Sequence, residues 1–395
     1  MCERYNRRTR FSNRGIENID IYCLFAMFSL REILMTYTTT RRRVLQAAGL
    51  GGTMALAGCT VGTPPDNNVQ ASPLQLQMDT ELGPAKPVDA NRIAADPRDI
   101  PAPITRTSPE TVSVELETLE QVAEVEPGVT FTYMTFNGQV PGPFIRTRVG
   151  DTVDLIIRNH EDNSMVHNVD FHACRGPGGG AEATNVAPGE ERQLRFKVTY
   201  PGAFVYHCAV ANVDYHISAG MFGIILVEPE EGLPEVDHEF YLGQHELYTN
   251  GKTGQKGHHE FDFTRMAMED PTYVLMNGEK YAITPDNYAE MNVKTGETAR
   301  IFYGVGGPNL FSSFHPIGSV WDEVWEQGAL ASEPMRYVQT TPVLPGSACV
   351  ATMSFPVPGD FKLVDHALSR VARKGALAII TAEGPEDTDV FDPVR

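Results

Sequence analysis

Residues 136–157 read FNGQVPGPFIRTRVGDTVDLII, a turn rich in Gly and Pro followed by residues in which apolar and polar side chains alternate. A similar stretch, MNGEKYAITPDNYAEMNVKTGETARIFY, occupies residues 276–303 and places Asn277 140 residues after Asn137. Self-similarity of this kind indicates a repeated structural unit. The chain is therefore predicted to contain one domain that has been duplicated.

Two further pairs of segments support the duplication. VDFH at residues 169–172 matches SSFH at 312–315, with His172 and His315 143 residues apart. PGAFVYHC at residues 201–208 matches PGDFKLVDH at 358–366. The matches keep the same order in both halves, which is what a tandem duplication predicts.

Both halves consist of short runs rich in β-branched and aromatic residues, separated by Gly and Pro turns and without long helical periodicity. These runs include VSVELETL (112–119), TVDLIIRN (152–159), RQLRFKV (192–198) and FGIILVEP (222–229). The pattern is typical of antiparallel β-sandwiches. We therefore expect an all-β chain with one domain over 109–233, a second over 234–386 and a C-terminal tail over 387–395.

Composition restricts the possible partners. The chain of 395 residues has 32 Lys and Arg against 51 Asp and Glu, a formal net charge of −19. An acidic surface repels the phosphates of nucleic acids and membranes. The sequence therefore argues against nucleic acid as a partner and allows membrane contact only through an anchor.

The first part of the chain resembles a targeting signal. Three arginines at 41–43 precede an apolar run over 44–57 that is too short to span a membrane. TRRRVL resembles a twin-arginine signal, and LAGC ends at Cys59 as a lipobox would. We expect a leader and signal over 1–58, a flexible tether over 59–108, and export to the periplasm or the outer face of the cell membrane, with a lipid anchor at Cys59.

The segment YHCAVANVDYHISAGM, residues 206–221, gathers side chains that bind metals. Seven residues separate Cys208 from His216, and four separate His216 from Met221. A thiolate, an imidazole and a thioether in one loop suit copper, with Met as a weak axial ligand. His167, 41 residues before Cys208, is the natural candidate for the fourth ligand. Two His, one Cys and one Met form the pattern of an electron-transfer copper site.

Two further histidines lie next to these ligands in the sequence. His207 directly precedes Cys208, and His172 follows His167 by five residues. Adjacent side chains on a strand point to opposite faces, so His172 and His207 are predicted to share the face away from the first metal. Each alone is more often a hydrogen-bonded surface residue. As a pair they favour a second metal, which then lacks one ligand for an open catalytic site.

The motifs HNVDFH, GGGAEAT, APGE, YHCA, GGPNLFSSFHPIG and LVDHALSRVARKGA resemble those of the copper-containing nitrite reductases, in that family's order. The resemblance covers residues 112–384 and is greatest to the branch with the short copper loop. It implies two tandem cupredoxin-like Greek-key β-sandwich domains in a homotrimer. It also implies two coppers per subunit, of type 1 and type 2.

The resemblance also assigns roles to individual positions. The type 1 ligands are His167, Cys208, His216 and Met221, and the type 2 ligands are His172, His207 and, from the neighbouring subunit, His366. Asp170 and His315 match the catalytic acid and the catalytic histidine, and Ile317 matches the residue that crowds the substrate.

The implied reaction is the one-electron reduction of nitrite to nitric oxide and water with two protons. The electron arrives from a small donor, a cupredoxin or a c-type cytochrome. An electron carrier with a single copper is a rival, but it leaves His172, His207, His315 and His366 without a role. A laccase-like multicopper oxidase is a second rival, but it needs His-x-His pairs, and none of the eleven histidines is two residues from another.

Overall fold

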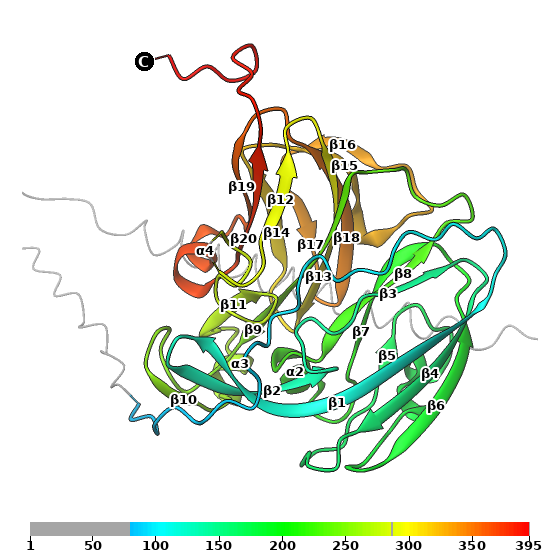
Figure 1. The fold of residues 1–395 in the computed structure, drawn as a ribbon. Helices are drawn as coiled ribbons and strands as arrows, with labels where there is room; N and C mark the ends of the chain where they lie inside the picture. Colours follow the sequence, from blue (N-terminus) through cyan, green and yellow to red (C-terminus); the bar gives the residue numbers. More distant parts are fainter. Residues whose placement is uncertain (1–79, 286, 395) are drawn as a thin grey trace, which may run out of the picture. The chain divides into compact units, whose positions relative to one another are not determined.

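The computed structural model of the chain describes residues 80–285 and 287–394. The predicted signal, the lipobox Cys59 and residues 59–79 of the predicted tether lie outside this range. Within it, no helix is long and apolar enough to cross a membrane. Strands dominate the described residues (Figure 1), and the predicted all-β fold class is confirmed.

The first sandwich contains β1 (Thr111–Glu126), β2 (Val129–Phe136), β3 (Ile145–Arg148), β4 (Thr152–Asn159), β5 (Asp170–Phe171), β6 (Glu191–Lys197), β7 (Gly202–His207), β8 (Phe222–Glu228) and β10 (Gly257–His259). They form one sheet in the order β10-β2-β1-β4-β6 and another in the order β3-β8-β7-β5. Apolar side chains alternate inward, as Val153, Leu155 and Ile157 do on β4, and pack with Phe171 of the facing sheet.

The second sandwich contains β9 (His238–Leu247), β11 (Tyr273–Met276), β12 (Met291–Lys294), β13 (Thr298–Gly307), β14 (Ser312–Ile317), β15 (Trp321–Trp325), β16 (Met335–Val338), β17 (Thr341–Val343), β18 (Ser347–Ser354), β19 (Gly359–Asp365) and β20 (Leu377–Glu383). Its sheets have the orders β11-β9-β13-β18-β15-β16 and β12-β20-β19-β14-β17. Phe314 of β14 and Tyr303 of β13 stack across its core with ring centroids 3.8 Å apart.

The sheets of both sandwiches are mixed, although the sequence pattern indicated antiparallel pairing. The pairs β1–β4, β10–β2, β3–β8, β9–β13 and β12–β20 are parallel. Parallel neighbours need a crossover between them, so the partners of these strands are not the ones that a short turn would connect. Sequence alternation identifies strands, but it does not reveal which distant strand lies alongside.

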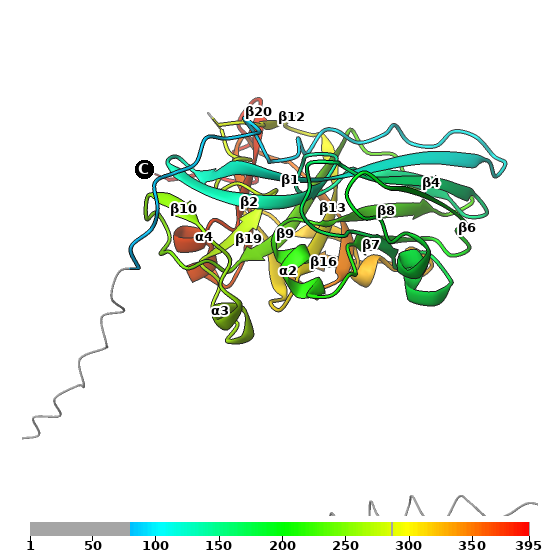
Figure 2. The same ribbon diagram turned by 90° about the horizontal axis from the view of Figure 1, so that it is seen from below.

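Within residues 80–285 and 287–394, five short helical segments connect the strands: η1 (Pro177–Ala183), α2 (Val213–Ser218), α3 (Phe263–Ala267), η2 (Glu326–Gly328) and α4 (Leu368–Lys374). Two of them matter for the site. Helix α2 lies against β9 and β13, as Figure 2 shows from below, and α4 follows β19. Helix α2 begins a few residues after Cys208, and α4 begins shortly after His366; both residues are predicted metal ligands.

The two sandwiches meet through an apolar cluster, to which Phe144, β7 and β8 contribute on one side and β9, β13, β15 and β18 on the other. Phe144 lies 5.1 Å from Tyr241 and 4.9 Å from Phe302 between ring centroids. A buried ion-pair cluster lies beside these rings, in which Arg146 and Arg300 both contact the Glu239 carboxylate at 2.8 Å. Arg146 also contacts Glu228 at 2.6 Å.

β10 departs from a simple division into two halves, because it belongs to the segment assigned to the second domain. It nevertheless pairs in parallel with β2 of the first sandwich, with His258 opposite Thr130. An uncovered edge strand leaves a row of unpaired N–H and C=O groups, and β10 pairs with these groups along the edge of β2. The predicted boundary between 233 and 234 itself stays a prediction.

The flexible tether predicted over 59–108 is wrong for part of its length. Ile93 and Ala94 are buried, and their amide N–H groups donate to the Glu279 carboxylate at 2.7 and 3.1 Å. The Arg92 side chain donates to the same carboxylate at 2.5 Å. Low periodicity in the sequence reflects irregular backbone here, and this backbone is held by long-range contacts that composition does not reveal.

Candidate metal centres

The first candidate centre forms where β7 ends. Cys208 follows β7, His216 lies on α2, and Met221 directly precedes β8. The amide of Cys208 donates to the Met221 carbonyl at 3.1 Å, and the amide of Met221 donates to the His216 carbonyl at 3.1 Å. These two hydrogen bonds hold the ends of the loop between Cys208 and Met221 together. His167 joins it from the segment before β5, where it exchanges two backbone hydrogen bonds with Val186.

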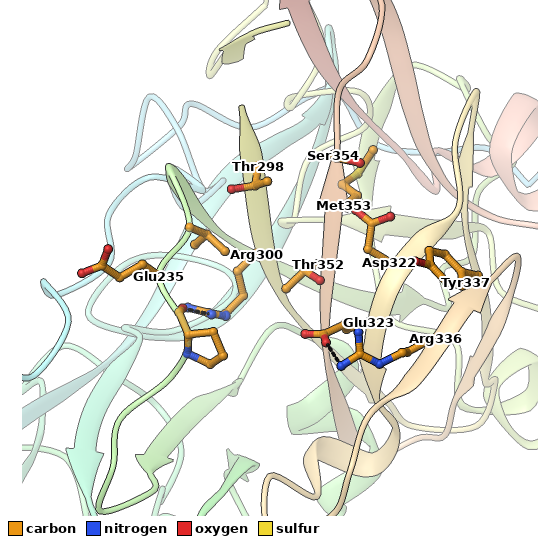
Figure 3. Close-up of a pocket in the computed structure, with 12 residues that line it drawn as sticks. Glu235, Thr298, Arg300, Asp322, Glu323, Arg336, Tyr337, Thr352, Met353 and Ser354 are labelled. Atoms are coloured by element: carbon orange, nitrogen blue, oxygen red, sulfur yellow. Dashed lines mark hydrogen bonds and ion pairs between the residues drawn. The ribbon is translucent and has the colours of Figure 1, made fainter. Parts of the chain in front are cut away.

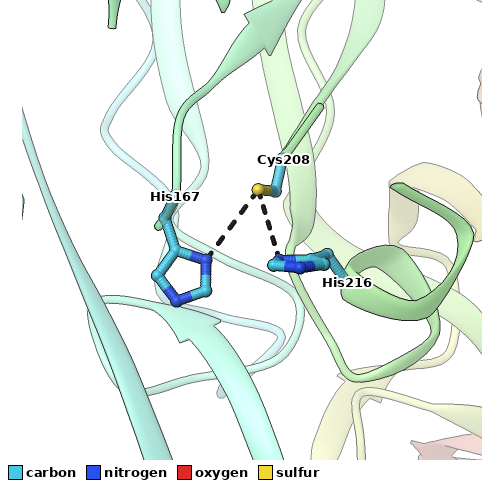
Figure 4. A group of neighbouring side chains, drawn as sticks. All are labelled: His167, Cys208 and His216. Carbon is cyan, nitrogen blue, oxygen red and sulfur yellow. Dashed lines mark hydrogen bonds between the residues drawn. The ribbon is translucent and has the colours of Figure 1, made fainter. Parts of the chain in front are cut away.

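Three predicted ligands converge in this centre, as Figure 4 shows. The Cys208 Sγ lies 3.5 Å from the His216 Nδ1 and 3.9 Å from the His167 Nδ1. All three side chains are fully buried. Met221 is also fully buried and packs in the same core cluster as Cys208. One thiol and two imidazole nitrogens directed at one point fit a copper ion better than a harder cation.

Burial decides the protonation of these ligands. It raises the pKa of the Cys208 thiol to about 11, and this effect outweighs a hydrogen bond from the Val210 amide, which lowers the pKa. It lowers the pKa of His216 to about 4, which keeps that imidazole neutral. A metal that binds here must therefore displace the proton of the thiol, whereas His216 is ready to coordinate.

Glu120 of β1 orients His167 and was not identified from the sequence. Its Oε1 accepts from the His167 Nε2 at 3.1 Å and from the Met165 amide at 2.8 Å, and its Oε2 accepts from the Ser164 hydroxyl at 2.6 Å. Burial raises the pKa of Glu120, but the hydrogen bonds of His167 and Ser164 outweigh it and lower the value to about 2. Because Nε2 carries the proton that His167 donates to Glu120, Nδ1 keeps a free lone pair, and this lone pair is directed at Cys208.

Asn168 was also missed, although it directly follows His167 in HNVDFH. Its Oδ1 accepts from the Ala209 amide at 2.7 Å and lies 3.7 Å from the Cys208 Sγ. The position next to a ligand was the available signal. Glu120 had no such signal, because it lies 47 residues before His167 and reaches it only through the fold.

The second candidate centre lies on the other side of the His207–Cys208 peptide. The ligand atoms of Asp170, His172 and His207 lie within 4.8 Å of one another. The Nε2 atoms of His172 and His207 are 3.1 Å apart. The Nδ1 of His207 lies 2.9 Å from the Cys208 carbonyl, to which it donates, so Nε2 keeps its lone pair. The partial shielding of the His172 ring from water by its neighbours, and then the nearby His207, lower the pKa of His172 below 6.5.

Two histidines of the second sandwich, His315 and His366, form a separate pair. His315 of β14 and His366, which follows β19, have ring centroids 5.1 Å apart. The His315 Nδ1 lies 2.6 Å from the Gln339 carbonyl, and Ile317 lies two residues further along β14 and is exposed. Among the described residues, the group around His172 and His207 contains Asp170 and no third histidine. His366 of the same chain is therefore not part of that group.

Neither of two surface hollows contains the second centre. One of about 380 Å³ is lined by polar and charged residues of the second sandwich, among them Glu323, whose carboxylate contacts Arg336 at 2.7 Å (Figure 3). The other, of about 440 Å³, is lined by Asn168 and Val210 and borders the Cys208 centre. The first hollow lies away from the predicted site residues.

Comparison with known proteins supports a copper protein. Residues 118–232 match the family described as multicopper oxidase. The chain is 46% identical over 294 residues to the copper-containing nitrite reductase of Neisseria meningitidis serogroup B, and the alignment covers 74% of each chain. It is 35% identical over 298 residues to the enzyme of the same name from Alcaligenes xylosoxydans xylosoxydans, which covers 71% of this chain and 88% of that one.

A solved structure agrees with these relatives. The copper nitrite reductase of Nitrosomonas europaea superimposes with a TM-score of 0.63 at 32% identity, covering 70% of this chain and 95% of that one. This match extends over both sandwiches, well beyond the range that the multicopper oxidase family matches. Identity of this extent over about three quarters of both sequences shows that the chain belongs to the copper-containing nitrite reductases.

Proposed function

We propose that the chain reduces nitrite to nitric oxide in the reaction NO2⁻ + e⁻ + 2H⁺ → NO + H2O. The observation that carries the proposal is the direct adjacency of His207 and Cys208 at the end of β7. Their side chains contribute to two different metal-capable groups, so one peptide joins the two centres. A single copper carrier does not need the second group.

Copper bound at the two centres would supply one-electron transfer at the first and a Lewis acid for nitrite at the second. His167, Cys208, His216 and Met221 would hold the first ion away from water, because all four side chains are fully buried. His172 and His207 would hold the second through Nε2 atoms that already lie 3.1 Å apart.

The third ligand of the second ion is His366 of a neighbouring chain, which makes a homotrimer a condition of activity. Two features support this assignment. The described group around His207 provides two histidines and the Asp170 carboxylate, and the proposal assigns that carboxylate to proton transfer, which leaves a position for a third imidazole. His366 is exposed and has His315 beside it, so it can present both a ligand and a proton-transfer group to another subunit.

The proton donors are Asp170 and His315. Asp170 pairs with His207 in the β5–β7 register, and its carboxylate belongs to the His172–His207 group. His315 donates its Nδ1–H to the Gln339 carbonyl, which leaves Nε2 to exchange a proton. Ile317 is exposed on the same strand and would limit the space available to nitrite at the second centre.

The electron donor is a small cupredoxin or a c-type cytochrome, and the protein acts in nitrite respiration outside the cytoplasm. The hollow beside the Cys208 centre supports an external donor, because small apolar residues such as Val210 and Ala211 line it. The export signal over 1–58 and the lipid anchor at Cys59 rest on the sequence motifs alone.

The test compares wild type with His366→Ala for nitric oxide production from nitrite with a reduced artificial donor. We expect the wild type to bind two coppers per chain and to produce nitric oxide. The variant is expected to keep its visible copper–thiolate band, because the first centre is intact, and to lose activity. If the wild type binds one copper per chain and forms no nitric oxide, the chain is an electron carrier.

A further inference from the structure

His366 combines an exposed side chain with a tightly held backbone. Its imidazole is on the surface beside His315, whereas its amide donates to the Ser313 carbonyl at 2.7 Å. An exposed turn that is free to move samples many conformations, and a ligand on it must be ordered when the metal binds. A residue that fixes this turn in advance lowers that cost.

Asp365 makes the contacts that fix the turn. Its side chain is fully buried, and its Oδ1 accepts from the amides of Ser313 and Ala367, each at 3.1 Å. One of these amides follows His366 in the chain, and the other lies on the neighbouring strand β14. The carboxylate therefore holds the backbone on two sides of His366 and ties it to the strand that carries His315.

Arg370 completes the arrangement from the first turns of α4. Its Nη1 donates to the Asp365 Oδ2 at 2.6 Å and to the Phe311 carbonyl at 2.7 Å. Phe311 directly precedes β14, so Arg370 also fixes the start of that strand. Only 19% of the Arg370 side chain is exposed, which shields the ion pair from solvent more than a surface pair.

We propose that Asp365 and Arg370 are positioning residues that orient His366, and with it His315, for the copper centre of the neighbouring subunit. The inference rests on the proposed function, because it takes His366 as a copper ligand. Neither residue would touch nitrite or copper. Their effect would be to hold the imidazole of His366 where the neighbour's His172 and His207 require it.

The experiment measures the affinity of the second copper in the purified full-length protein, using competition with a copper chelator and the electron paramagnetic resonance signal of that site. The variants are Arg370→Gln and Asp365→Asn, which remove the ion pair at nearly constant size. Arg370→Lys keeps one charged donor, and Arg373→Gln is the matched control on an exposed position of the same helix.

We expect Arg370→Gln and Asp365→Asn to weaken binding of the second copper about 10- to 100-fold, the range found when a group that orients a metal ligand is removed. The copper–thiolate band and the trimer should persist, and Arg370→Lys should recover most of the affinity. If Asp365→Asn does not fold, Arg370→Gln decides alone.

Unchanged affinity in Arg370→Gln, equal to Arg373→Gln, overturns the positioning role while leaving nitrite reduction intact. Loss of the trimer together with the copper also overturns it, since the pair then acts in assembly. A wild-type protein that holds only the first copper overturns this inference and the proposed function together.

Discussion

The two candidate metal centres differ in how much of each one chain can build. The Cys208 centre is fully buried, with three ligand atoms from residues 167–216 already directed at one point. The centre at His207 has an exposed His172, and the second sandwich presents His315 and His366 as a separate pair. Folding of one chain brings the residues of the first centre together, whereas under the proposed function the second centre needs His366 from a neighbouring chain. Substitutions in the two regions should therefore fail in different ways.

The largest effect is expected from Cys208→Ala, because no other described thiol lies in the first group. The visible copper–thiolate band should disappear and nitrite reduction should fall to the background of the assay. The second copper should remain, since His172 and His207 are unchanged. Absorption spectra and copper analysis after purification test this, and a variant that retains full activity contradicts electron entry through Cys208.

Gly179→Ala should damage the second region without removing its copper. Gly179 has φ +55, and a Cβ there would lie 1.8 Å from the Asp170 Oδ1 and 2.9 Å from the Phe171 carbonyl. If Asp170 is the proton donor, as proposed, its displacement should lower the rate on the order of a hundredfold. Steady-state kinetics should show this loss at full copper content. Gly189→Ala is the control, with φ +78 but only the Glu161 Cβ nearby, at 4.0 Å, and it should remain active.

Glu120→Gln tests the preorganisation of the buried centre. The amide keeps the shape but can place its NH2 group against the His167 Nε2, which then no longer selects the Nδ1 lone pair. Affinity for the first copper should fall about 10- to 100-fold, and the second site should not change. Chelator competition monitored at the copper–thiolate band measures it. Equal affinity in the variant and the wild type would show that Glu120 serves only the fold.

The smallest expected difference between the two centres is in how their copper affinities depend on pH. The Cys208 pKa of about 11 means that the metal displaces one proton at every pH below that value, while His216, at about 4, adds none above it. First-site affinity in the metal-free protein should therefore rise about tenfold per pH unit between pH 7 and 9. His172, whose pKa is lowered from 6.5, adds no such dependence above pH 7 at the second site. Titrations at three pH values measure both slopes.

Sequence reasoning succeeded where the relevant contacts are local. The group around Cys208 gathers side chains from one loop around residues 206–221 plus His167, and His172 lies beside His207 in a separate group. These predictions needed only the geometry of a strand and the chemistry of the side chains. The roles assigned to the residues by family resemblance stay predictions.

The rest depends on which distant segments lie side by side. Glu120 reaches His167 across 47 residues, and Asp365 reaches Ser313 across 52. The parallel pairing of β10 with β2 and the packing of Ile93 depend on the same kind of long-range contact. No periodicity in one sequence reveals the register between such segments, so these features appear only in the folded chain.

The cluster between the sandwiches has a consequence for anyone who wishes to express one half alone. A fragment ending at residue 233 would expose Phe144, which now packs on Tyr241 and Phe302, and would lose the β10 cover of β2. It would also separate Arg146 from Glu239. A contiguous apolar face and an uncovered strand edge both promote aggregation. Each sandwich therefore depends on the other for its solubility, and the smallest soluble fragment is expected to contain both.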